Sequence, residues 1–283
     1  MFERLQDVPN LTKLALSGNA FSDACTSVAP ASLLKVPLMT TLDLYNTGID
    51  EAGICAVADT LCHLSSLSAM HLGGRNWGHS GMLAVTEVLR HARLTMLDVS
   101  DCEFDQADTH GLCCALRHVP QLTALHLSNN NIRDAGARMI AGALRHVPTL
   151  TSLDLSENEI SFVGVLDISE ALRYVPQLTR LMLSHNRISD EGTRTVADSL
   201  LRVPALVELS LENNCIGDAG ASVLAKALRY TPHLAKLELA GNSIGISGWS
   251  MLSGARYLVP KLTSQRVLTM KATLGMPKSA TKA

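Results

Sequence analysis

Aromatic side chains are scarce in this chain of 283 residues, since Phe, Trp and Tyr together make up 4% of it. Its core must therefore be filled by aliphatic side chains, which suits narrow, uniform layers. An excess of one charge is also lacking, because the formal net charge is −2. Bulk electrostatics thus give no reason to expect binding to nucleic acid or to an anionic membrane.

Targeting and pairing signals are missing as well. No apolar run is long enough to span a bilayer, and the start Met1-Phe2-Glu3-Arg4 lacks the charged-then-apolar pattern of a signal peptide. The seven cysteines are odd in number and irregularly spaced. We therefore expect reduced thiols and a cytoplasmic, intracellular protein.

Catalytic motifs are equally absent from the sequence. The segment Gly241-Asn-Ser-Ile-Gly-Ile-Ser-Gly248 lacks the lysine of a phosphate-binding loop. His110, Cys114 and His118 could share one helix face, but no Cys-x-x-Cys pair supports a zinc site there. The sequence predicts a protein that is not an enzyme and that holds no cofactor or metal.

What the sequence does contain is one phrase repeated at a fixed step, Leu-x-x-Leu-x-Leu-x-x-Asn-x-Ile-x-x-x-Gly. Its first position falls at Leu11, Met39, Leu67, Leu94, Leu122, Leu150, Leu178, Leu206, Leu234 and Leu262. Every step is 28 residues except the step from Leu67 to Leu94, which is 27. A period in this range predicts a solenoid, whose extended surface is typical of binding proteins.

The repeat from Leu150 to Gln177 shows what one unit is made of. Its apolar-polar-apolar alternation predicts a short strand on which Asp154 faces outward. Gly164 stands where a side chain would crowd the turn into a helix, and Pro176 ends that helix. Each unit is thus strand, turn, helix and turn, with parallel strands on one face and helices on the other.

A column of asparagines follows the strands. We expect each buried amide to bond backbone groups of its own and of the neighbouring coil, because leaving them unpaired costs roughly 1–3 kcal/mol each. The column consists of Asn19, Asn130, Asn158, Asn186, Asn214 and Asn242, and it is interrupted by Thr47, Arg75 and Cys102.

The unit Leu122-Thr-Ala-Leu-His-Leu-Ser-Asn-Asn-Asn-Ile-Arg-Asp-Ala-Gly136 resembles the ribonuclease-inhibitor-like class of leucine-rich repeat proteins, and the resemblance runs from about Leu5 to Leu268. That class includes enzyme inhibitors, the sensing arms of NOD-like receptors and Ran GTPase-activating proteins. The resemblance implies an α/β leucine-rich-repeat solenoid, a curved horseshoe with a parallel β-sheet on its concave face and helices on its convex face.

The expected organisation is one repeat domain over residues 1–270 and a disordered basic tail over residues 271–283. The domain would hold about nine full repeats, a partial N-terminal repeat and a degenerate C-terminal cap. The segment from Arg4 to Pro9 aligns with Ala143 to Pro148, so the chain begins inside the last turn of a helix. We therefore expect a fragment of a longer array, or an edge that a partner covers.

The concave face is the predicted binding surface. Adjacent strands lie about 4.8 Å apart, so its central column would be a ladder in which carboxylates raise the pKa of neighbouring histidines. The candidate contact residues are Asp43, His71, Asp98, His126 and Asp154 of the ladder, with Tyr45, Glu157, Glu208, Glu212 and Glu238 beside or beyond it. The other interpretation is that Asp at these positions only provides solubility.

The repeats from Met39 to Gln121 depart most from the pattern. Either this segment has drifted in a tolerant architecture, or it is shaped for a partner, with Trp77 and Tyr45 as anchors. Arg75 and Trp77 are the secondary candidate contact residues, although Trp77 occupies the Ile column and could instead belong to the core. A row of arginines at the helix ends, such as Arg117 and Arg145, is expected to complement the helix dipoles, or else to meet an acidic partner.

The leading functional hypothesis is a non-catalytic protein–protein interaction scaffold whose partner is basic where it docks. Neither nucleic acid nor membrane is expected as a partner, and the chain would be a monomer or part of a larger chain. One alternative is a GTPase-activating protein of the Ran GTPase activator type, in which exposed Arg75 would stabilise phosphoryl-transfer charge. The other is a sensing-arm fragment of a NOD-like receptor or of another larger leucine-rich repeat protein.

Overall fold

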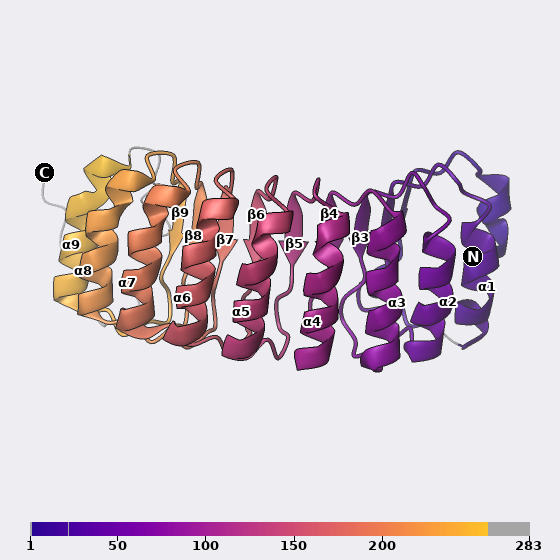
Figure 1. The fold of residues 1–283 in the computed structure, drawn as a ribbon, viewed down its shortest axis with the longest axis horizontal. Coiled ribbons are helices and arrows are strands. Elements are labelled where there is room, and N and C mark those ends of the chain that lie inside the picture. Colours follow the sequence, from indigo (N-terminus) through magenta and orange to yellow (C-terminus); the bar gives the residue numbers. More distant parts are fainter. Residues whose placement is uncertain (1, 22, 260–283) are drawn as a thin grey trace, which may run out of the picture.

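Each repeat folds into a three-residue strand, a turn, a helix and a return turn (Figure 1). The computed structural model describes residues 2–21 and 23–259. The strands are β1 (Lys13–Ala15), β2 (Thr41–Asp43), β3 (Ala69–His71), β4 (Met96–Asp98), β5 (Ala124–His126), β6 (Ser152–Asp154), β7 (Arg180–Met182), β8 (Glu208–Ser210) and β9 (Lys236–Glu238). The repeat that starts at Leu262 and the predicted tail lie outside the described residues.

Nine helices alternate with these strands within the described residues. They are α1 (Asp23–Leu33), α2 (Glu51–Leu61), α3 (Gly78–His91), α4 (Gln106–Ala115), α5 (Arg133–Ala143), α6 (Phe162–Ala171), α7 (Ser189–Ser199), α8 (Asp218–Ala227) and α9 (Ile246–Gly254). Short 3₁₀ turns cover Phe2–Asp7, Leu116–His118, Leu144–His146, Leu172–Tyr174, Leu200–Arg202, Leu228–Tyr230 and Ala255–Leu258. The first of these stands where the last turn of a helix was expected.

The strands form one parallel sheet in the order of the sequence, and the helices cover one face of it (Figure 1). Each strand residue pairs with the residue one repeat further on, so that Leu125 lies opposite Leu153 and His126 opposite Asp154. Packed helices need about 8–10 Å, whereas strands lie about 4.8 Å apart. The sheet side is therefore the concave side, and the predicted α/β solenoid is confirmed.

The core is built from the leucines of the repeated phrase. Leu97, Leu125 and Leu153 are fully buried, as are the helix residues that face them, such as Val165 and Ile168. Each such side chain contributes about 1.5–3 kcal/mol by burial. The narrow space between sheet and helices is filled by aliphatic groups in layers, which explains why so few aromatic residues are needed.

The asparagine column joins neighbouring coils as expected. Asn158 is fully buried. Its Nδ2 donates to the Leu127 carbonyl of the preceding coil (2.9 Å) and to Ser156 of its own coil (2.8 Å). Its Oδ1 accepts from the backbone N of Asn130 (3.2 Å). One side chain therefore satisfies three backbone groups in two coils.

Where the asparagine is replaced, other groups fill part of its role. The Thr47 hydroxyl donates to the Leu44 carbonyl (2.7 Å), and the buried Cys102 thiol donates to the Ser100 carbonyl (3.4 Å). Burial raises the pKa of the Cys102 thiol strongly, which keeps it protonated. Arg75 is exposed and so leaves the column, and its Nη1 donates to the Gly48 carbonyl (3.2 Å).

The N-termini of α6, α8 and α9 are bound by a carboxylate of the preceding coil. Asp134 Oδ1 accepts from the backbone N of Ser161 (2.8 Å) and of Gly164 (3.0 Å). Asp190 and Asp218 bind the same two positions of their next helices. A Cβ at Gly164 would come within 2.6 Å of Asp134 Oδ1, so glycine is required where this carboxylate binds. The predicted crowding at Gly164 is thus confirmed.

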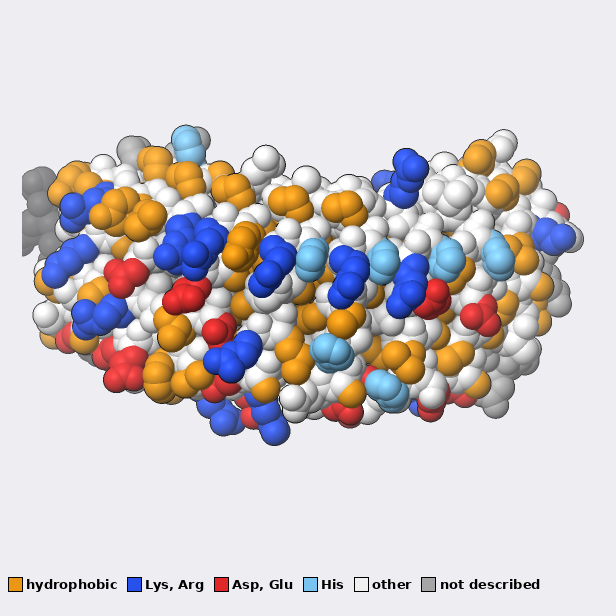
Figure 2. All heavy atoms as spheres, viewed as in Figure 1, with side chains coloured by type: hydrophobic (Ala, Val, Ile, Leu, Met, Phe, Trp, Pro, Cys, Tyr) orange, Lys and Arg blue, Asp and Glu red, His pale blue; other side chains and the backbone are white. Residues whose placement is uncertain are grey.

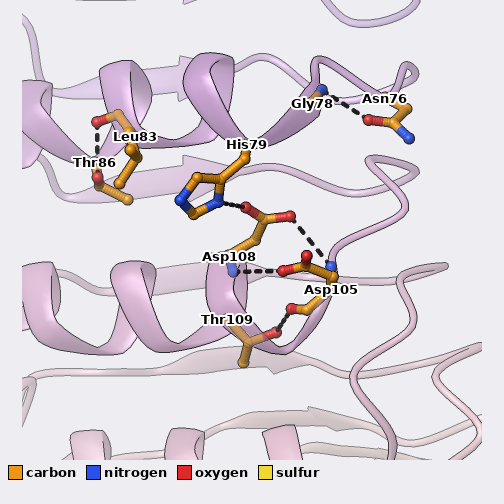
Figure 3. A network of polar contacts seen from close by, with 8 residues as sticks. All are labelled: Asn76, Gly78, His79, Leu83, Thr86, Asp105, Asp108 and Thr109. Atoms are coloured by element: carbon orange, nitrogen blue, oxygen red, sulfur yellow. Dashed lines mark hydrogen bonds and ion pairs between the residues drawn. The ribbon is translucent and has the colours of Figure 1, made fainter.

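Between α3 and α4 this cap is rebuilt from different residues (Figure 3). His79 stands at the position of Asp134, and Asp108 at the position of Gly164. The backbone N of Asp108 donates to Asp105 (2.8 Å) and the backbone N of Asp105 donates to Asp108 (3.2 Å), which is a capping box. His79 Nδ1 lies 2.8 Å from the other Asp108 oxygen. The loss of the consensus glycine is thus compensated locally.

The asparagine column gives the first prediction. Asn158→Ala leaves buried backbone groups unpaired in two coils, so we expect the free energy of unfolding to fall by roughly 2–4 kcal/mol. Urea unfolding followed by circular dichroism measures it. Asn19→Ala is the matched control, since Asn19 is exposed and its bonds stay within its own coil. Equal losses in the two variants would contradict this role for the column.

The rebuilt cap gives the second prediction. His79→Asp alone adds a third carboxylate to Asp105 and Asp108 and should lower the midpoint of thermal unfolding, because like charges repel. Adding Asp108→Gly to that variant restores the arrangement made by Asp134 and should recover most of the loss. Differential scanning calorimetry of the three proteins measures this. A double variant less stable than His79→Asp would show that the pair does not replace the Asp–Gly cap.

Candidate functional site

The predicted ladder is formed on the concave face by the register of the sheet. Asp43 pairs with His71, His71 with Asp98, Asp98 with His126 and His126 with Asp154. All five side chains are partly exposed. The three carboxylates also accept from the backbone N two residues on, at Tyr45 (3.0 Å), Ser100 (3.1 Å) and Ser156 (2.9 Å). Asp at these positions therefore also ends the strand, as an Asx turn does.

One histidine of the ladder is paired directly. His71 Nδ1 lies 3.5 Å from Asp98 Oδ2. The hydrogen bond with Asp98 raises the pKa of His71, and this outweighs the opposing effect of burial. Burial alone would raise the pKa of Asp98, but hydrogen bonds from His71 and Ser100 lower it. The expected favouring of the charged histidine is thus borne out at His71. The Nε2 of His126 instead lies 3.3 Å from the Ser152 hydroxyl.

Two carboxylates in the C-terminal part of the face, Glu208 and Glu238, are paired within the chain. Glu208 pairs with Arg180 (3.0 Å) and with Lys236, and Lys236 also pairs with Glu238 (2.9 Å). Burial tends to lower the pKa of Lys236, but its bonds with Glu208 and Glu238 raise it. These pairs lie in register across β7, β8 and β9, so Glu208 and Glu238 are largely neutralised within the chain.

The acidic character lies on β2 to β6 and the residues that follow them. None of these five strands contains Lys or Arg. Asp43, Asp154 and Glu157 on this part of the face form no ion pair within the described part of the chain, and neither does Glu212 after β8. We name the surface made by Asp43, Asp98, Asp101, Asp154 and Glu157 the acidic sheet face.

Tyr45 lies at the edge of this surface and is bonded to Asp101, which was not among the predicted contact residues. Its hydroxyl donates to Asp101, 56 residues further along the chain, and Asn129 Nδ2 donates to the other carboxylate oxygen. The bond to Asp101, with burial second, raises the pKa of Tyr45 to about 12. The spacing held a signal, because Asp101 and Asn129 follow their strands at the same position, one repeat apart.

A cleft of about 550 Å³ opens beside this group. It is lined by residues that follow β3, β4 and β5, namely Gly74, Arg75, Asn76, Asp101, Glu103, Asn129 and Asn131. Arg75, predicted as a secondary contact residue, lies on its wall. Trp77 is only 4% exposed and packs in the core. The indole therefore cannot serve as an exposed anchor, and the core interpretation of Trp77 holds.

Metal ligation has one geometric candidate among the described residues. His79, Asp105 and Asp108 each bring a ligand atom within 4.8 Å of the others (Figure 3). Their contacts are those of the rebuilt helix cap, which accounts for the cluster without an ion. His110, Cys114 and His118 do not form such a group within the described residues. Cys114 Sγ lies 3.6 Å from His110 Nε2.

The opposite face carries the row of cations expected at the helix ends (Figure 2). In four of these arginines, the side-chain Nε donates to the backbone carbonyl three residues earlier, at 2.7–2.8 Å. The pairs are Arg117 and Cys114, Arg145 and Gly142, Arg173 and Glu170, and Arg229 and Lys226. These bonds satisfy carbonyls at the helix C-termini, where cations also complement the dipole. They support the structural interpretation of the row.

Comparisons with known proteins agree with this geometry. A family model described as "Leucine rich repeat" matches residues 120–188, and a second of the same description matches residues 204–225. The fold is a leucine-rich-repeat solenoid. The family models match the repeats whose sequences lie nearest the repeated phrase. They do not distinguish between subclasses of leucine-rich repeat. No curated protein sequence matches the chain.

Several solved structures share the fold at low sequence identity. An internalin of Listeria monocytogenes matches with a TM-score of 0.55 and 21% identity, over 92% of this chain and 68% of the internalin. The Arabidopsis receptor kinase HAESA, solved with a peptide hormone and a co-receptor, matches with a TM-score of 0.51 and 19% identity. The match covers 83% of this chain and 35% of the HAESA chain. TLR13, solved with an RNA, matches with a TM-score of 0.52 and 18% identity, over 88% of this chain and 35% of the TLR13 chain. This chain thus spans about a third of the latter two.

Among the described residues, no helix is both long and apolar enough to cross a membrane.

The His71–Asp98 pair gives the third prediction. Because the folded-state pKa of His71 lies above its unfolded value near 6.5, the pair stabilises the fold below that pH and loses this effect as the pH rises through the folded value. Asp98→Asn should therefore cost more stability at pH 5.5 than at pH 8, and should lower the pKa of His71 in an NMR titration.

The control for this pair is Asp154→Asn, which leaves His71 and its partner intact and should not move the pKa of His71. A His71 pKa that stays the same in Asp98→Asn would contradict the assigned cause.

Proposed function

We propose that this chain is a non-catalytic protein-interaction module that binds a protein partner through the acidic sheet face. The observation that carries the proposal is the alignment of five carboxylates on and beside β2 to β6, with no Lys or Arg in those strands. The partner is basic where it docks, because opposite charge favours encounter and fixes the docking register.

The form of the surface supports the same proposal. The carboxylates are held by backbone bonds at Tyr45, Ser100 and Ser156 and by the sheet itself, so little conformational entropy is lost when a partner binds. HAESA and TLR13 were solved with a peptide hormone and with an RNA, respectively. A face of carboxylates repels phosphate, so protein is the partner that fits this chain.

The finer parts of the proposal follow from the sequence. The 28-residue period supports assignment to the ribonuclease-inhibitor-like class, and the cysteine pattern supports a cytoplasmic location. The cysteines described in the structure are all free thiols. The module would act as a monomer or as part of a larger chain.

The two alternatives stay predictions. The Arg75 guanidinium is exposed but donates to the Gly48 carbonyl, and no catalytic arrangement surrounds it in the described residues. No specific observation favours a Ran-type GTPase activator or a NOD-like receptor arm over the proposed module.

The fourth prediction tests the proposed face with three amide substitutions, Asp98→Asn, Asp154→Asn and Glu157→Gln, which remove charge and keep shape. A partner captured by the unaltered chain should bind the triple variant at least tenfold more weakly in calorimetry. Its affinity for the unaltered chain should fall as salt rises from 50 to 500 mM, because screening weakens exposed charge pairs.

The matched control removes three exposed carboxylates from the helix face, by Glu87→Gln, Glu170→Gln and Glu191→Gln. Binding should survive in this control. A partner held equally by the sheet-face variant, with no dependence on salt, would contradict the proposed function.

A further inference from the structure

The repeat position directly after the asparagine column carries a carboxylate in two of the coils, and the two can be compared. In five successive coils it holds Asn76, Glu103, Asn131, Glu159 and Arg187. Glu103 and Glu159 share a left-handed backbone, with φ of 53° and 55°. They are therefore two copies of one site, separated by two repeats, and their surroundings can be compared directly.

In the later copy the carboxylate holds two guanidinium groups. Glu159 Oε2 lies 3.4 Å from Arg133 Nε and 3.4 Å from Arg187 Nη2. Arg187 is the residue of the next coil at this same position. The chain itself thus shows which ligand a carboxylate at this place accepts, namely an arginine side chain from beside it.

In the earlier copy neither of the two arginine positions holds a cation, because Asn131 stands at the position of Arg187 and Gly78 at the position of Arg133. Asn76 Nδ2 donates to Glu103 Oε2 (3.0 Å). Gly78 in turn donates to Asn76 Oδ1 (2.8 Å), which fixes the amide. Within the described chain Glu103 forms no ion pair. Glu103 therefore presents its charge to solvent in the cleft.

A second carboxylate lines the same cleft. Asp101 is held by the Tyr45 hydroxyl and by Asn129, both neutral donors, and it too lacks an ion pair in the described chain. Arg75 on the wall donates to Gly48 and pairs with neither acid. The cleft of about 550 Å³ thus holds two fixed carboxylates and amide groups, and its volume exceeds that of one side chain.

We propose that this cleft takes the guanidinium of an arginine presented by the protein partner, a step that rests on the proposed function and names its contact. Arginine fits better than lysine, because a planar fork of donors can bond Asp101 and Glu103 together, as one ammonium point charge cannot. The partner's arginine would take the place that Arg187 occupies at Glu159.

The test uses a defined probe, the blocked tripeptide acetyl-Gly-Arg-Gly-amide, titrated into the full chain and followed by NMR. Millimolar binding that shifts the side-chain amide signals of Asn76, Asn129 and Asn131 is expected. The citrulline tripeptide, equal in shape but neutral, should not bind, and the lysine tripeptide should bind at least threefold more weakly. The variant Asp101→Asn/Glu103→Gln should weaken arginine binding at least fivefold.

The matched control is Glu159→Gln, at the position of Glu103 two repeats further on and outside the acidic sheet face. It should bind the arginine tripeptide as the unaltered chain does. Equal binding of the citrulline or lysine tripeptide, or unchanged arginine binding by Asp101→Asn/Glu103→Gln, would overturn the proposal. Amide dispersion in the spectra confirms that each variant is folded.

Binding of the captured partner to the two variants distinguishes the arginine cleft from the proposed function on which it rests. A partner lost with the Asp98/Asp154/Glu157 variant but held at full affinity by Asp101→Asn/Glu103→Gln would overturn the arginine cleft and leave the proposed function standing. Loss with both variants supports both proposals. Loss with neither overturns both for that partner.

Discussion

The spacing of one coil on the next is the constraint on which the rest of this structure depends. Parallel strands lie about 4.8 Å apart, and buried amides such as Asn158 hold that spacing by bonding backbone groups of two coils. Side chains at equivalent positions are therefore stacked in columns. The chemistry of each column, more than that of any single residue, decides what the surface can bind.

Stacking charges so closely is costly unless the column alternates or is paired. On the central column His71 and His126 separate the three carboxylates, and His71 bonds Asp98. On the C-terminal strands Arg180 and Lys236 flank Glu208. Several carboxylates are thus paired within the chain. In the proposed function, those that form no ion pair among the described residues mark where a partner supplies the opposite charge.

The irregular repeats from Met39 to Gln121 depart from the repeated phrase in two ways. His79 and Asp108 replace a consensus Asp and Gly, and together with Asp105 they satisfy the same backbone groups. That departure is drift compensated inside the fold. Glu103 differs from Glu159 in the opposite way, because its guanidinium partners are missing and a cleft stands beside it. The two interpretations of this segment therefore apply to different residues.

Much of this could be read from the sequence, because the period determines the register. The ladder from Asp43 to Asp154 and the role of the asparagines follow from spacing alone. Contacts between columns do not: Tyr45 reaches Asp101 only because side-chain length and turn geometry bring them together. Neutralisation of Glu208 by Lys236 was readable from their 28-residue separation, whereas the burial of Trp77 depended on packing that the Ile column only suggested.

Hydrogen exchange of the backbone amides, with and without a captured partner, tests the central claim most directly. The account predicts slowed exchange in residues 43–46, 71–76, 98–103, 126–131 and 154–157, which lie on the acidic sheet face and around the cleft. It predicts little change along the exposed sides of α3 to α6. Slowed exchange confined to those helices would contradict it.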